Sequence, residues 1–502
     1  MKSTATLTLT PLRIRIEAPT GTSLHSLLFQ YGIEFPCGGR GACRGCRVKV
    51  LEGSLPISLV EESILSEEEL RDGWRLACQN TLDGDLLLDV AQWEAPFLSD
   101  ESAFAFTPRD GLGIAVDVGT TTIVSQLLDL RAGTVLAVES GLNQQAVFGA
   151  DIMSRVDAAV THGRQEDLTS TVRNQVVAMI RALLKSSGVD PAQIVDMVLV
   201  GNSVMHHLFG GLDCLPLSHF PFTPVHLESL EFSPTDLSWD LPPQAHVRFL
   251  PLLGGFVGSD ILAGILATKA NEQENAICLI DLGTNGEVVI GSRRGLVCCS
   301  AAAGPAFEGA RISMGMRAAT GAIAAVTVDG DRLTCEVIGD AEPRGICGSG
   351  LVDAVAALLQ SGRIEPSGLI AGNAGSIRLA GNVRLTQGDV RELQLAKGAI
   401  AAGVRILCEE SGIRPEDIAT IHLAGAFGNY VNRLSARRIG LVEFPPDRIV
   451  SSGNTALRGA KQALFAECGT IDSIVNATRH VPLHAHPRFQ EYYVDAMRFP
   501  AG

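Results

Sequence analysis

Four cysteines near the start of the chain have the number and spacing of a metal-binding set. Cys37, Cys43 and Cys46 lie within the stretch PCGGRGACRGCRV, and Cys78 follows after 31 intervening residues. Their C-x5-C-x2-C…C pattern is close to the C-x4-C-x2-C…C spacing of one class of 2Fe-2S centre, whereas zinc sites usually contain two C-x2-C pairs. Glycines between the cysteines allow a tight loop whose N–H groups turn toward sulfur. We therefore expect one 2Fe-2S cluster on these four thiolates, with a zinc site or a plain thiol loop as the alternative.

A second kind of chemistry is indicated by the pattern D-x-G-T, which occurs twice. Asp117 begins DVGT after the apolar run GIAV, and Asp281 begins DLGT after ICLI. The small residues of such a turn let backbone N–H groups approach phosphate oxygens, and the threonine hydroxyls add donors. A carboxylate at the strand end holds Mg²⁺ through water more readily than it touches phosphate, because two anions repel. Two copies in the same setting therefore predict a phosphate site with Mg²⁺.

The two D-x-G-T segments belong to an internal repeat. They lie 164 residues apart, and a second matching pair follows in the same order, MVLVGNSVMHHLFGG (197–211) and IHLAGAFGNYVNRL (421–434). Each member of the second pair reads as a strand, a glycine turn and a helix. Matching pairs in matching order predict a duplicated domain with a cleft between its halves, the second half starting near residue 275.

The elements around the cysteines are short. LTLTPLRIRIEA reads as a hairpin, SLHSLLFQYG as a short helix, CRVKVLEG as a strand, VEESILSEEELRDG as one acidic helix, and GDLLLDVAQWE as a final strand. This first domain is expected to span residues 1–95. PFLSDESAFAFTPRD has no hydrophobic period, so residues 96–110 are expected to form a linker ahead of a domain over 111–502.

Composition narrows the class of protein. The chain has 502 residues, 46% of them hydrophobic, and a net charge of −15. That length predicts two or three domains, and the negative charge argues against nucleic acid as a partner. No run of 18 apolar residues is present, so we expect no membrane span. The N-terminus alternates like a strand instead of forming an apolar signal region, and the clustered cysteines favour metal ligation over disulfides, so we expect a cytoplasmic protein.

These segments resemble two known folds. The elements around the cysteines resemble the β-grasp of 2Fe-2S ferredoxins, and the repeat resembles the superfamily of acetate and sugar kinases, heat-shock chaperones and actin (ASKHA). The implied fold class is an α/β multidomain protein, with a β-grasp 2Fe-2S ferredoxin followed by a duplicated RNase H-like (actin-like) ATPase domain. The resemblance implies two phosphate loops and an adenosine motif. The first loop would be Asp117, Gly119, Thr120, Thr121 and Thr122, and the second Asp281, Gly283, Thr284 and Asn285. The adenosine motif would be Gly425, Ala426, Phe427 and Gly428.

The whole chain resembles the reductive activators of corrinoid-dependent enzymes. The strings GLNQQAVFGADIMSRV (141–156), LGGFVGSDILAG (253–264) and AGPAFEGARISMGMRA (303–318) carry part of this likeness. Members of that family use ATP to help an electron reach inactive cob(II)alamin and restore cob(I)alamin. The resemblance therefore implies one 2Fe-2S cluster, ATP with Mg²⁺, an upstream electron donor, and a corrinoid protein of the methyltransferase or methionine synthase type as partner.

Several assignments keep an alternative. Asp117 and Asp281 are the expected catalytic carboxylates; Glu287 is expected to orient the attacking water, with a structural role as the alternative. His206 and His207 follow the glycine turn of the first half and could approach cobalt or pack inside the domain. The whole protein could also be a small-molecule kinase with a regulatory iron-sulfur domain, or a plain ferredoxin donor fused to a silent nucleotide-binding domain.

Overall fold

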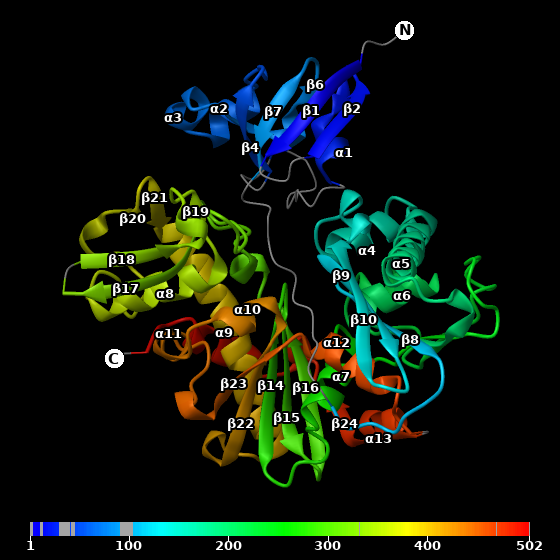
Figure 1. Cartoon of the computed structure of the whole chain (residues 1–502). Coiled ribbons are helices and arrows are strands. Elements are labelled where there is room, and N and C mark those ends of the chain that lie inside the picture. Colours follow the sequence, from blue (N-terminus) through cyan, green and yellow to red (C-terminus); the bar gives the residue numbers. More distant parts are fainter. Residues whose placement is uncertain are drawn as a thin grey trace. The chain divides into compact units, whose positions relative to one another are not determined.

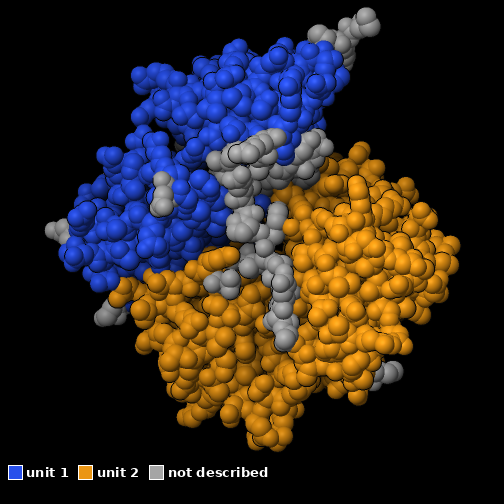
Figure 2. Space-filling view, in the orientation of Figure 1, with its two compact units in different colours: residues 1–96, 305–394, 499–502 blue, residues 97–304, 395–498 orange. Residues whose placement is uncertain are grey.

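The computed structural model describes residues 4–10, 14–29, 41, 46–90, 104–330, 332–467 and 469–500. The chain divides into two compact units. Unit 1 comprises residues 1–96, 305–394 and 499–502, and unit 2 comprises residues 97–304 and 395–498 (Figure 2). This division groups 305–394 with the N-terminal residues, whereas the bounds expected from sequence group them with the ATPase domain. The sequence-based bounds therefore stay a prediction.

The N-terminal part of unit 1 is a small mixed sheet with short helices. Its elements are β1 (Thr4–Thr10), β2 (Ile14–Pro19), β3 (Thr22–Ser23), α1 (Leu24–Phe29), β4 (Arg47–Glu52), α2 (Leu59–Ile64), α3 (Glu67–Arg71), β5 (Trp74–Leu76), β6 (Thr81–Leu82) and β7 (Leu86–Asp89). Five strands form one sheet in the order β2-β1-β7-β4-β5, with β1 and β7 parallel. Figure 1 labels four of them, β1, β2, β4 and β7. Alternate residues of β1, among them Leu7 and Leu9, are buried, as expected for a strand with one face on a core.

The single acidic helix expected after β4 is two short helices. Ser58 and Ser66 each form a capping box with a glutamate three residues later, so a second helix starts where the first ends. Leu65, between them, has extended backbone angles. The Glu61 carboxylate is buried and accepts hydrogen bonds from Leu76 N (2.7 Å) and Asn80 Nδ2 (3.0 Å). Glu61 therefore stabilises the segment that carries Cys78 and is not part of an exposed acidic surface.

The later part of unit 1 contains a three-stranded sheet, a hairpin and a helix. Its elements are β17 (Ala322–Asp329), β18 (Arg332–Val337), β19 (Gly345–Ile346), α8 (Gly348–Gln360), β20 (Ser376–Ala380) and β21 (Val383–Thr386). α8 approaches β17 so closely that a Cβ on Gly350 would lie 2.1 Å from the Ile323 carbonyl oxygen. The boundary between the units falls inside the long helix α9 (Gln387–Ser411).

Unit 2 contains two six-stranded sheets. The first half comprises β8 (Leu112–Val118), β9 (Thr122–Asp129), β10 (Thr134–Leu142), α4 (Ile152–Val160), α5 (Gln165–Ser187), β11 (Ile194–Val200), α6 (Ser203–Gly210), β12 (Leu230–Phe232), β13 (His246–Phe249) and α7 (Ser259–Thr268). The second comprises β14 (Ala276–Leu282), β15 (Gly286–Ser292), β16 (Gly295–Ala301), β22 (Ile418–Ala424), α10 (Gly425–Tyr430), α11 (Arg433–Arg438), β23 (Ile449–Gly453), α12 (Thr455–Ala463), α13 (Thr470–Ala477), β24 (Thr478–His480) and α14 (Phe489–Ala496).

The two sheets repeat one topology. The order β10-β9-β8-β11-β13 in the first matches β16-β15-β14-β22-β23 in the second. Figure 1 shows β14, β15 and β16 of the second sheet side by side. In each, the first two strands of the half form an antiparallel hairpin and a later strand pairs parallel to the first. The repeated order is the structural counterpart of the internal repeat in the sequence.

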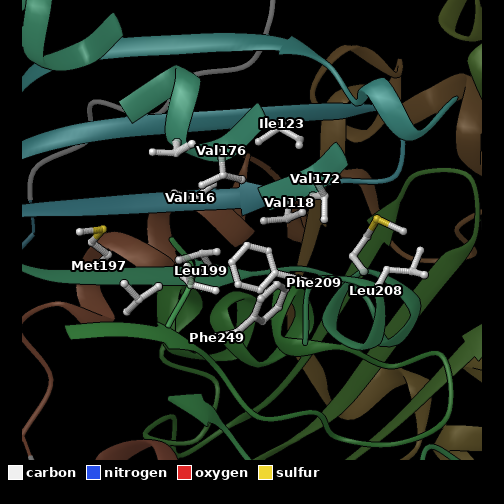
Figure 3. Packing of buried hydrophobic residues seen from close by; sticks show 14 of the residues in the cluster. Val116, Val118, Ile123, Val172, Val176, Met197, Leu199, Leu208, Phe209 and Phe249 are labelled. Atoms are coloured by element: carbon white, nitrogen blue, oxygen red, sulfur yellow. The ribbon is translucent and has the colours of Figure 1, made fainter. Parts of the chain in front are cut away.

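Alternate residues of β8 serve two hydrophobic cores. Val116 and Val118 pack with Val172 and Val176 of α5 on one face of the sheet (Figure 3). Ala115 faces the other side, where buried residues of α7 and α12 lie against both sheets. α7 and α12 cross closely, since a Cβ on Gly459 would lie 1.9 Å from the Ala263 carbonyl oxygen. These two helices therefore form a rigid layer between the halves of unit 2.

Residues 104–110, which lie inside the expected linker, pack on unit 2. The Phe106 ring lies 4.8 Å from that of Phe465 between centroids, and the Phe104 ring lies 5.4 Å from it. The Arg109 guanidinium donates to the Leu464 carbonyl oxygen and to Asp196 Oδ2. The segment is therefore anchored to unit 2 from Phe104 onward. None of the helices in the described part of the chain combines the length and apolarity needed to cross a membrane.

Candidate functional site

The two D-x-G-T turns end equivalent strands of unit 2. Asp117 lies near the end of β8 and Asp281 near the end of β14. Gly119 permits the first turn, because a Cβ there would lie 2.4 Å from the Thr122 carbonyl oxygen. In the second turn, Gly283 N donates to the Asn285 carbonyl oxygen (3.0 Å).

The expected adenosine motif lies directly beside the second turn. β22 is parallel to β14, and Asp281 is paired with Ala424. The next residue, Gly425, has a φ of +81° and starts α10. A Cβ on Gly425 would lie 2.7 Å from Asp281 Oδ1. Glycine is therefore required both by this close contact and by the positive φ. Gly428 continues α10 and Phe427 is buried.

Glu287 is brought next to Asp281 by the hairpin. The two residues are directly paired across β14 and β15, and Glu287 is paired in turn with Ser300 of β16. Ser300 Oγ donates to Glu287 Oε1 at 3.0 Å. Three neighbouring strands thus place an aspartate, a glutamate and a serine in one row across the sheet.

Asp260 lies near both aspartates of the candidate site and was not predicted from the sequence. It lies in the first turn of α7. Its pKa is raised to about 7, mainly because burial disfavours the charged carboxylate and then because Asp281 and Asp117 are negative. In the sequence, GSD before an apolar run signals only a helix start. Nothing local indicates that this helix start lies near both D-x-G-T turns.

The four carboxyl groups interact electrostatically. Burial raises the pKa of Asp117 to about 6, although a hydrogen bond from Asn454 Nδ2 (2.9 Å) opposes that increase. Burial and then Asp117 raise the pKa of Asp281 to about 7. Burial, Asp260 and Asp281 raise the pKa of Glu287 well above its usual value. A divalent cation placed among these carboxylates would relieve their repulsion.

The donor set fits Mg²⁺ bound together with a phosphate. All four carboxyl-bearing residues are partly accessible to solvent. Within the described ranges, no three His, Cys, Asp or Glu side chains form a ready-made metal site. Mg²⁺ keeps several waters and is commonly held by one or two carboxylates plus substrate phosphates, which agrees with this looser arrangement.

The first D-x-G-T turn is supported by Asn202, another residue that the sequence did not predict beside it. Its side chain caps α6 by accepting hydrogen bonds from Val204 N (3.1 Å) and Met205 N (3.0 Å). The same side chain donates to Thr120 Oγ1 at 2.8 Å. The glycine turn of the repeat therefore has a role in the first half equivalent to that of Gly425 in the second, since each brings the start of a helix to a D-x-G-T turn.

His206 and His207 are fully buried in the core of the first half. Burial lowers the pKa of His206 to about 3 and that of His207 to about 4, so both imidazoles are neutral at physiological pH. His207 Nδ1 donates to the Ser203 carbonyl oxygen (2.9 Å) and His206 Nε2 to that of Glu228 (3.2 Å). These contacts support the packing interpretation of the pair.

Two of the four expected cluster ligands lie within the described residues. Cys46 is buried and Cys78 is partly buried on the short 3-10 helix Ala77–Gln79. Ala77 N donates to the Cys46 carbonyl oxygen (3.0 Å), so a backbone hydrogen bond joins the segments that carry the two cysteines. Gln79 Nε2 donates to Cys78 Sγ at 3.4 Å, a bond suited to a thiolate. Cys37 and Cys43 lie outside the described residues.

Known proteins resemble this chain along its length. Three family models match it: a 2Fe-2S iron-sulfur cluster binding domain over residues 7–82, the RACo middle region over 112–273, and the C-terminal ASKHA domain of RACo over 275–502. These matches confirm the expected fold class, a 2Fe-2S ferredoxin domain ahead of an ASKHA domain.

Two curated relatives and one solved structure cover most of the chain. The corrinoid activation enzyme RamQ of Eubacterium limosum is 37% identical over 414 residues, covering 76% of this chain and 69% of its own. The Co(II) methylated amine-specific corrinoid protein reductase of Methanosarcina barkeri is 28% identical over 418 residues, which are 76% of each chain. The solved reductive activator for corrinoid, iron-sulfur protein superposes on 99% of this chain and 98% of its own, with 27% identity and a TM-score of 0.68.

Proposed function

Because this chain belongs to the RACo family of corrinoid protein activators, we propose that it uses ATP to drive an electron onto the cobalt of a partner corrinoid protein. The partner's cobalt is the substrate: it gains one electron and changes from Co(II) to Co(I). The relatives that cover most of the chain favour this function over the kinase and the plain ferredoxin donor. A cytoplasmic location belongs to the same proposal, because thiols are kept reduced there.

The ATP-dependent part of the proposal is carried by one observation, the approach of four carboxyl groups from both halves of unit 2. Asp117 and Asp281 would hold Mg²⁺ through water at the two phosphate loops. Asp260, with a pKa near 7, is suited to accept a proton from the attacking water. Glu287, held by Ser300, would orient that water.

The iron-sulfur part rests on Cys46 and Cys78, with Cys37 and Cys43 proposed to complete the ligand set. A 2Fe-2S cluster on these thiolates supplies one electron at a time at a low potential. The hydrogen bonds of Glu61 and Gln79 fix the segment around Cys78, and the amide of Gln79 stabilises negative charge on its sulfur.

ATP is needed because reduction of the corrinoid is energetically unfavourable. For one electron, every ~59 mV uphill makes the equilibrium tenfold less favourable. A nucleotide can shift that equilibrium only if the activator binds the states of its partner with different affinity. We propose a corrinoid methyltransferase component as the partner, because the Methanosarcina barkeri relative is a reductase of a methylated amine-specific corrinoid protein.

The decisive experiment follows the Co(I) absorbance of such a corrinoid protein. The full chain, a strong chemical reductant and Mg-ATP should produce Co(I), and omission of ATP should abolish most of it. Asp117→Ala should remove the ATP effect while the iron-sulfur spectrum stays unchanged, because a separate domain carries the cluster. Asp240→Ala, at an exposed position of the same unit, is the matched control.

Each alternative predicts a different result. Equal rates and extents with and without ATP would favour a plain electron donor. ATP turnover stimulated by sugars or carboxylic acids, and not by the corrinoid protein, would favour a kinase. Activation of a methionine synthase in place of a methyltransferase corrinoid protein would retain the reaction but overturn the partner assignment.

A further inference from the structure

The first phosphate loop is held by hydrogen bonds to its carbonyl groups. Asn143 Nδ2 donates to the Gly119 carbonyl oxygen at 2.9 Å, and Arg155 Nη2 donates to that of Thr120 at 2.6 Å. In a trans peptide the N–H group points opposite to the carbonyl. The N–H groups of Thr120 and Thr121 therefore point away from Asn143 and Arg155. An array of N–H groups facing one way is an anion-binding arrangement.

Arg155 is unusual among the residues behind this loop because it carries a charge. Arg155 lies on α4 and its side chain is fully buried. The side chains of Asn143 and Gln145, which precede α4, are also fully buried. Besides Thr120, the guanidinium donates to the Gly149 carbonyl oxygen (2.9 Å), to Gln145 Oε1 (3.4 Å) and to Met205 Sδ (3.6 Å). All of these acceptors are uncharged.

Among the described residues, the buried charge of Arg155 has little compensation. Burial lowers the pKa of Arg155 to about 9, and the opposing effect of the Asp151 carboxylate is smaller. Asp151 is already engaged at the start of α4, where it accepts a hydrogen bond from Ser154 N at 2.8 Å. A buried cation without a paired carboxylate is costly unless a ligand supplies the negative charge.

We propose that Arg155 is a positioning residue for the nucleotide phosphates, and that the phosphates complete its charge balance. The guanidinium fixes the direction of the Thr120–Thr121 peptide, and its positive charge favours an anion in front of the loop. An arginine is required because its planar fork reaches the Gly149 and Thr120 carbonyl oxygens together, which a single ammonium group does less well. This inference rests on the proposed nucleotide site.

The test compares nucleotides that differ in phosphate number. The dissociation constants of Mg-ATP, Mg-ADP and adenosine are measured by calorimetry on the full chain, for the wild type, Arg155→Met and Arg155→Lys. Loss of a charge-assisted hydrogen bond corresponds to a weakening of about 10- to 100-fold. Arg155→Met should weaken Mg-ATP by that amount and adenosine by less than about twofold. Arg155→Lys, which keeps the charge but not the fork, should give an intermediate loss.

Arg173→Met is the matched control. Arg173 is partly buried in the same half, where it donates to the Phe209 carbonyl oxygen at 2.7 Å and packs on the Phe209 and Phe232 rings. It lies on α5 and its hydrogen bond goes to Phe209 instead of the phosphate loop, so its loss should affect stability and not the preference for phosphate.

The outcomes separate this inference from the function on which it depends. A wild type that does not bind Mg-ATP overturns the nucleotide site itself. A wild type that binds while the Arg155 variants bind Mg-ATP equally well overturns only the role of Arg155. Equal weakening of Mg-ATP and adenosine also overturns it, because that result indicates a purely structural residue. If Arg155→Met does not fold, the same comparison of Mg-ATP and adenosine binding is made with Arg155→Lys.

Discussion

Asp281→Asn should stabilise the folded protein while it removes the proposed ATPase activity. The Asp281 carboxylate is held near the negative Asp117 and Asp260 at a partly buried position. The isosteric amide removes the charge without leaving a space. A substitution at a site that stores repulsion for the sake of function commonly raises stability and lowers activity.

The size and pH dependence of the effect follow from the pKa. Each pKa unit corresponds to about 1.4 kcal/mol, so raising the pKa of Asp281 from 3.8 to about 7 costs the folded state at most about 4 kcal/mol at pH 8. Partial solvent access and coupling to Asp117 reduce this to about 1–4 kcal/mol. Between pH 4 and pH 7 the folded protein keeps protons that the unfolded chain has released, so stability falls as pH rises through that window.

The assay is thermal unfolding in EDTA at pH 5 and at pH 8. At about 2 °C per kcal/mol, Asp281→Asn should unfold about 2–8 °C above the wild type at pH 8, with a smaller difference at pH 5. Asp240→Asn, at an exposed position, should change little at either pH. Mg-ATP should stabilise the wild type more than the variant at pH 8. A variant that unfolds below the wild type at pH 8, or a difference independent of pH, would refute the electrostatic reasoning.

Three further predictions concern separate parts of the chain. Cys78→Ser should lose most of the two irons expected per chain, and zinc in the native protein or full iron in the variant would contradict the cluster. Asp260→Ala should reduce Mg-ATP hydrolysis at least about 100-fold with an unchanged iron-sulfur spectrum, whereas normal turnover would exclude it from the site. Phe106→Ala should speed tryptic cleavage after Arg109, because the ring contact with Phe465 holds that segment; cleavage at the wild-type rate would mean that the contact contributes nothing.

The turns of the site could be predicted because their determinants are local. An apolar strand followed by D-x-G-T predicts a hairpin, and the structure has the hairpins β8–β9 and β14–β15 at those places. The phosphate-binding role of the two turns stays a prediction. The strand pairing that puts Gly425 beside Asp281 could be anticipated from the repeat, since both halves show strand, glycine and helix in the same order.

The residues that escaped prediction depend on contacts far apart in the sequence. Asp260 reads locally as the beginning of a helix, and only the packing of α7 between the two sheets brings it near Asp117. Arg155 reads as an ordinary helix residue, and only the fold reveals that its guanidinium is buried behind the phosphate loop. Phe104 and Phe106 lie in a segment without a hydrophobic period, where two aromatic rings in a polar stretch are the local sign of a packing contact.

The residues at the two ends of α12 contact two different parts of the protein: the Asp117 carboxylate and the aromatic residues of the linker. Asn454, immediately before this nine-residue helix, hydrogen-bonds the Asp117 carboxylate. Phe465, just after it, holds the aromatic segment through which the chain reaches the iron-sulfur domain. A helix of nine residues is about 13 Å long, and α7 packs tightly along it. Asn454 and Phe465 lie at opposite ends of α12, so a ligand that changes the hydrogen bond of Asp117 would act on the same short helix that anchors residues 104–106.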